Sequence, residues 1–146
     1  ASREELMDAV MGRVVDELEP DLRAALDAQD TVEGLARYIT RFLEFCEANP
    51  AQTRALVAVV AHRSMTVPGS YDDAVETSLT DLVALFERGQ GEGSMRRFDP
   101  VVMAGLLRRA LDGEALRVAG GVPAATAAHE LVEIFVRATR ADAEER

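Results

Sequence analysis

The side chains best suited to chemistry in this sequence are two adjacent residues, His62 and Arg63. They follow an apolar helical stretch, where an imidazole and a guanidinium could bind an anionic or hydrogen-bonding group of a small molecule. Equally, they could cap the last carbonyl groups of that helix, because the helix dipole favours positive charge there. The sequence leaves both interpretations open.

The remaining reactive side chains give less indication of a functional site. Cys46 is the single cysteine, which is typical of a small buried apolar residue and less often of a redox sensor. We expect His129 to be a surface or interface residue rather than a metal ligand. The sequence contains no phosphate-binding glycine loop, no His-Glu-x-x-His and no cysteine pair. We therefore expect no enzyme activity, no metal and no cofactor, with a small helical enzyme built around His62 as a remote alternative.

Composition narrows the class of protein further. The chain has 146 residues, 26 acidic and 16 basic, and a formal net charge of −10. This length predicts one domain over residues 1–146. Such an acidic chain should be repelled by DNA, because DNA-binding surfaces are basic. The sequence shows no signal peptide and no apolar run long enough for a membrane span, so we expect a cytoplasmic protein without membrane contact.

Helical periodicity and helix-start signals repeat along the chain and predict an all-α bundle of six helices. Ser2 and Glu5 form a capping box at the first helix, in which Pro20 predicts a break or kink. Gly89 to Gly93 is predicted to be a flexible connection, and turns are predicted at Pro68-Gly69 and Gly120-Gly121. The predicted helices begin near Ser2, Asp30, Pro50, Ser70, Asp99 and Pro123.

Several apolar side chains of the middle helices could line a ligand cavity with an aromatic wall and a few polar anchors. The alternative is that these residues form plain core. The candidate ligand-binding residues are Phe42, Phe45, Cys46, Val59, His62, Arg63, Tyr71, Leu82, Phe86 and Met103.

The helix predicted over residues 99–118 is apolar on two sides. Met103, Leu107 and Ala110 mark one side, and a second side needs a partner of its own, either a neighbouring helix or a second copy. We favour a homodimer, since Gly105 and Gly113 would let a facing backbone approach closely. The candidate dimer-interface residues, which include two from the last helix, are Val102, Gly105, Leu106, Arg109, Leu131 and Phe135.

The stretches Ser2 to Leu6, Gly93 to Pro100 and Leu111-Asp112-Gly113 contain three short motifs, which together resemble the regulatory domain of TetR-family transcriptional regulators. The opening Ser-Arg-Glu-Glu-Leu of residues 2–6 resembles the start of the family's linking helix. The segment Gly93 to Pro100 resembles its G-x-x-R-x-x-D-P junction, and Leu111-Asp112-Gly113 matches a common L-D-G. The resemblance implies that the last two helices form a four-helix dimer interface and that the earlier helices enclose a mostly apolar pocket.

The resemblance also implies a function. The family's DNA-binding helix-turn-helix would precede Ala1, so DNA would be contacted only through that separate domain. The chain would be the effector-sensing and homodimerisation domain of a regulator of the repressor type, with a small lipophilic or aromatic effector. The alternative is a stand-alone helical module that docks a different protein.

Overall fold

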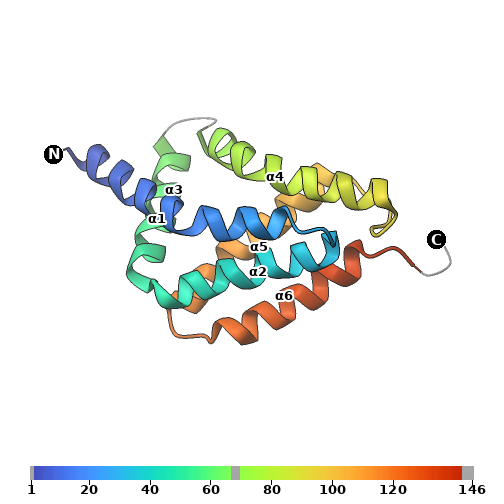
Figure 1. Ribbon diagram of the computed structural model, residues 1–146. Coiled ribbons are helices and arrows are strands. Elements are labelled where there is room, and N and C mark those ends of the chain that lie inside the picture. The colour runs from blue at the N-terminus through green and yellow to red at the C-terminus, as the bar shows by residue number, and fades with distance from the viewer. Residues whose placement is uncertain (1, 67–69, 143–146) are drawn as a thin grey trace.

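The computed structural model describes the backbone of residues 2–66 and 70–142, and the side chains of residues 2–61 and 79–142. This described part contains six α-helices and confirms the predicted all-α fold (Figure 1). In chain order the helices are α1 Arg3–Leu26, α2 Thr31–Ala48, α3 Pro50–Thr66, α4 Ser70–Glu92, α5 Pro100–Ala119 and α6 Ala124–Thr139.

The helix α2 lies at the centre of the bundle and touches each of the other five helices. Figure 1 shows α2 between α1 and α6, with α5 running behind it. Apolar residues recur every three or four positions along α2, so one broad side of the helix is removed from water. Leu35, Ile39 and Leu43 are completely buried there. The core of the protein is therefore organised around α2.

Three of the six predicted helix starts are confirmed by their hydrogen bonds. The Ser2 hydroxyl accepts from the Glu5 backbone N–H at 3.1 Å, while the Ser2 N–H donates to the Glu5 carboxylate at 2.7 Å. Asp30 caps α2 and Asp99 caps α5 through carboxylate oxygens that accept backbone N–H bonds of 2.9–3.1 Å. These bonds satisfy N–H groups that have no partner within a helix. Pro50 begins α3 directly after Asn49, as expected.

Of the break or kink expected at Pro20, the break does not occur, because α1 continues through Pro20 to Leu26. A proline removes one hydrogen bond to the carbonyl four residues earlier, here that of Asp16. Asp16 and Pro20 are both exposed, so water can satisfy that carbonyl. Figure 1 shows that α1 bends along its length without ending. The turn expected at Pro68-Gly69 lies outside the described residues.

The prediction of a flexible connection at Gly89 to Gly93 is wrong. Helix α4 runs to Glu92, and only Gly93 leaves the helix, with a φ of +77° that suits glycine. Gly89 has a packing role, since a Cβ at this position would lie 2.6 Å from the Met95 sulfur. The glycine lets the chain fold back closely against the end of α4. The glycine-rich stretch therefore marks a tight contact and not a loose connection.

The segment after Gly93 joins the ends of α4 and α6. The Arg96 N–H donates to the Thr139 carbonyl at 2.9 Å, and the Ala141 N–H donates to the Ser94 carbonyl at 3.1 Å. The Phe98 ring meets the Phe86 ring edge-on, with ring centres 5.4 Å apart. These contacts fix the direction in which the chain enters α5.

Candidate ligand-binding and docking sites

The structure brings together part of the predicted ligand-binding set. Phe42 and Cys46 of α2 and Leu82 and Phe86 of α4 belong to one buried core cluster, to which α1, α5 and α6 also contribute. Phe45 and Met103 are partly buried and pack against that cluster, whereas Val59 is buried outside it. The side chains of His62, Arg63 and Tyr71 lie outside the described residues. Apart from Val59 on α3, the described members pack as core around the place where α2, α4 and α5 meet.

A charged group that the sequence reasoning passed over lies against this cluster. Arg108 sits on the side of α5 that faces the core, next to Leu107 and Leu111, which are completely buried. Its guanidinium lies over the Phe42 ring, 4.8 Å from the ring centre. Its Nε and Nη2 atoms both donate to the Oδ1 atom of Asp112, at 3.1 and 2.6 Å. We call these groups, together with Tyr38 beside them, the Arg108 centre.

Burial controls the electrostatics of the Arg108 centre. It raises the pKa of Tyr38, because a phenolate is poorly solvated there, although the positive charge of Arg108 opposes part of that rise. Burial acts to lower the pKa of Arg108, but Tyr38 and Asp112 outweigh it and the pKa is raised. Burial also raises the pKa of the Cys46 thiol. The centre therefore holds a fixed cation, paired with Asp112, beside a neutral phenol, and the Cys46 thiol outside the centre is neutral as well.

One sequence signal could have revealed this arginine. Arg108 falls at helical spacing with Ala104, Leu111 and Ala115, all of which are buried, so it shares their face. Asp112 follows four residues later, which suits an ion pair along one helix. Among the arginines of α5, only the neighbouring Arg109 was a candidate from the sequence, and it is exposed on the outer face.

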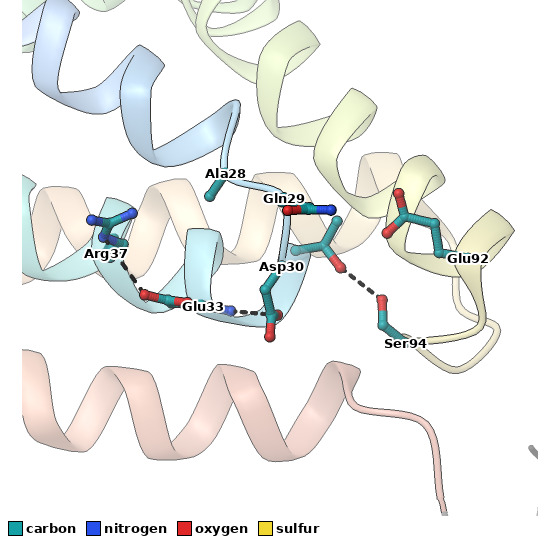
Figure 2. Close-up of a pocket in the computed structure, with 8 residues that line it drawn as sticks. Ala28, Gln29, Asp30, Glu33, Arg37, Glu92 and Ser94 are labelled. Atoms are coloured by element: carbon teal, nitrogen blue, oxygen red, sulfur yellow. Dashed lines mark hydrogen bonds and ion pairs between the residues drawn. The ribbon is translucent and has the colours of Figure 1, made fainter.

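A separate surface hollow of about 560 Å³ lies where the loop before α2 meets the end of α4 (Figure 2). Its rim is polar and exposed, and it includes Asp30, Glu33, Arg37 and Glu92. These groups already have partners: Asp30 caps α2, Arg37 lies 4.0 Å from Glu33, and Glu92 lies 3.9 Å from Arg88. At its floor the hydroxyls of Thr31 and Ser94 bond to each other at 2.7 Å. The arrangement stabilises the helix ends and leaves no clear anchor for a ligand.

The outer face of α5 is apolar and open. The exposed fractions of Val102, Leu106 and Leu116 are 58%, 52% and 46%. With Arg109 and Gly113 between them, these residues recur at alternating intervals of four and three, the spacing of a helix–helix contact. We call these five residues the α5 stripe. A Cβ at Gly113 would meet nothing within 4 Å, so space for a partner lies directly over the stripe.

The other predicted interface residues divide between two environments. Gly105 lies beside the α5 stripe, and a Cβ there would meet only the side chain of Arg109 within 4 Å. Leu131 and Phe135 of α6 instead lie in the core of their own chain. On α6 the large exposed apolar residue is Ile134, which is 56% exposed. The α5 half of the predicted interface is therefore at the surface, and the α6 half is turned inward.

Comparisons with known proteins add no relative, since no family model, curated protein or solved structure matches this chain. Among the described residues, no helix is both long and apolar enough to cross a membrane. Within the same residues, no group of three or more His, Cys, Asp or Glu side chains is placed to hold a metal ion.

Proposed function

We propose that this chain is the effector-sensing and homodimerisation domain of a TetR-like transcriptional regulator of the repressor type. A separate helix-turn-helix domain would make the DNA contacts, which suits the net charge of −10. The observation that carries the proposal is the two-sided character of α5. One side is buried against the bundle, and the α5 stripe on the other side is apolar except for Arg109 but is exposed.

The α5 stripe favours a second copy of the chain as its partner. Exposed apolar surface of this kind is costly in water unless another surface covers it. In a twofold dimer the same face meets itself, so an apolar stripe is complementary to its own copy. The glycines at positions 105 and 113 leave room for close approach of the two α5 backbones. Ile134 on α6 is a further large apolar residue left exposed for a partner to cover.

The sensing part of the proposal rests on the Arg108 centre and the core cluster around it. An effector that binds one conformation of this region more tightly than another shifts the population between the two. A large change in DNA occupancy needs a difference in binding free energy of about 5 kcal/mol between those conformations. Helix α1 contacts α2, α3 and α4, so it is placed to move with them.

A helical module that docks a different protein is the second candidate, because the same exposed stripe could bind a foreign helix. The two candidates differ in the oligomeric state of the purified chain. Under the first proposal the chain forms dimers by itself. Under the second it stays a monomer until its partner is added.

Size-exclusion chromatography with light scattering tests the proposal. We expect a mass of twice the 15.8 kDa chain at tens of micromolar. Leu106→Arg should give a monomer with unchanged helical content, because it places a charge in the middle of the α5 stripe. Leu6→Arg is the matched control, since Leu6 is 63% exposed on α1, and it should remain a dimer. A monomeric wild-type chain, or a dimeric Leu106→Arg variant, would contradict the proposal.

A further inference from the structure

Arg108 is an unusual residue for the inner face of a helix. The exposed fraction of its side chain is 15%, while that of its partner Asp112 is 35%. Transfer of a guanidinium from water into a protein interior costs free energy, and a single ion pair seldom returns more than that cost. A leucine would fill the same place without the cost. A structural role alone therefore gives little reason for an arginine at this position.

The surroundings of Arg108 match those that recognise a carboxylate. A guanidinium presents planar N–H donors that suit two carboxylate oxygens, and the Phe42 ring beneath it holds that plane in place. Tyr38 lies beside the guanidinium, and its raised pKa keeps the phenol protonated at neutral pH. Next to these polar groups the core cluster supplies aromatic and aliphatic side chains from α2 and α4.

Asp112 occupies the place that a ligand carboxylate would take. A single oxygen of Asp112 accepts both hydrogen bonds from Arg108. Because Asp112 is the more exposed partner, it can turn toward water when another carboxylate displaces it. An incoming acid then exchanges one carboxylate for another, and the guanidinium never loses its counterion.

From this geometry we infer that the Arg108 centre binds a small organic acid, a carboxylate carried on an aromatic or aliphatic body. Arg108 holds the carboxylate, Phe42 orients the guanidinium, and Asp112 acts as the internal competitor. The inference names the effector class of the proposed sensor domain and rests on that proposed function.

Calorimetric titration of the whole 146-residue chain with benzoate, phenylacetate and octanoate tests the inference. At least one acid should bind with a Kd below about 1 mM, and its neutral amide should bind more weakly. Arg108→Gln should weaken the binding of that acid by about 10- to 100-fold, since it removes charged hydrogen bonds. Arg108→Lys keeps the charge without the planar donors, and its affinity for the acid should lie between those of the wild type and Arg108→Gln.

Asp112→Asn separates this inference from a purely structural ion pair. If Asp112 competes with the ligand, its loss should tighten acid binding by up to about fivefold. This factor corresponds to the free energy of a partly exposed ion pair. A structural pair predicts no gain in affinity. Glu114→Gln on the same helix is the matched control, because its partner is the exposed Arg117 and not Arg108. It should leave the affinity unchanged.

Three results would each overturn the inference: no binding of any of the three acids, equal binding by folded Arg108→Gln, or no gain in Asp112→Asn. Circular dichroism of each variant establishes that it is folded. The titrations are repeated in Leu106→Arg, which separates this inference from the dimer. Acid binding by a chain that never dimerises would reject the proposed function alone, and a dimer that binds none of the acids would reject only the inference.

Discussion

The two faces of α5 are built from similar residues and have opposite environments. Leu107 is completely buried against the bundle, whereas its neighbour Leu106 is 52% exposed. The same contrast separates Ala104, Leu111 and Val118 on the inner face from Val102 and Leu116 on the outer face. One face is covered by the chain's own helices, and the other has no cover from the described part of the chain. The difference teaches that the inner face specifies the fold, while the outer face is free to specify a partner.

The largest effect that this comparison predicts comes from shortening the two adjacent leucines. Leu107→Ala should lower the free energy of unfolding by about 3–5 kcal/mol, because it leaves a cavity in the core. Leu106→Ala should mainly remove contacts with a partner, because Leu106 is 52% exposed, so most of its effect should depend on protein concentration and be lost at high dilution. Urea unfolding at several protein concentrations measures both. Equal, concentration-independent losses in the two variants would show that the faces do not differ.

A pair of glycines gives the next largest effect. Gly89→Ala should lower the free energy of unfolding by about 1–3 kcal/mol, because the new Cβ would lie 2.6 Å from the buried Met95 sulfur. Gly113→Ala should instead stabilise the monomer by up to about 1 kcal/mol, because its Cβ meets nothing and alanine favours helix. Thermal unfolding in the Leu106→Arg background isolates the monomer. A loss of stability in Gly113→Ala there would mean that the outer face is already packed.

The smallest predicted effect concerns pH. Because burial raises the pKa of Tyr38, the folded state favours the neutral phenol. This contribution to stability is fully present below the ordinary tyrosine pKa of about 10 and is lost as pH rises through the higher folded value. Only two tyrosines are present, so phenolate absorbance in Tyr71→Phe reports Tyr38 alone. Titration of Tyr38 at its ordinary pKa would refute the buried environment.

The sequence predicts the helices and their first turns well, because capping is local. The Ser2–Glu5 box and the caps at Asp30 and Asp99 each involve residues within a few positions of one another. The break considered at Pro20 and the flexible connection expected from Gly89 were wrong for a different reason. The consequence of each depends on what surrounds it, which is solvent at Pro20 and the Met95 side chain at Gly89.

Candidate sites were harder to predict, because they depend on how helices face one another. The periodicity of α5 separated Leu107 from Leu106 correctly, yet it did not reveal that Arg108 lies over the Phe42 ring of α2. On α6 the sequence could not show whether the apolar residues Leu131 and Phe135 face a partner or their own chain. The structure packs α2 against α6 and buries both residues. Sequence spacing defines the face of a helix, and only packing defines what covers it.

The central claim is that a second copy of the chain covers the α5 stripe, and maleimide labelling of Leu106→Cys tests it most directly. Leu6→Cys on α1 serves as the exposed reference, and the natural Cys46 is buried. Position 106 should be protected at high protein concentration and should become as reactive as position 6 on dilution, when the dimer dissociates. If position 106 reacts as fast as position 6 at every concentration, nothing covers the stripe and the homodimer is wrong.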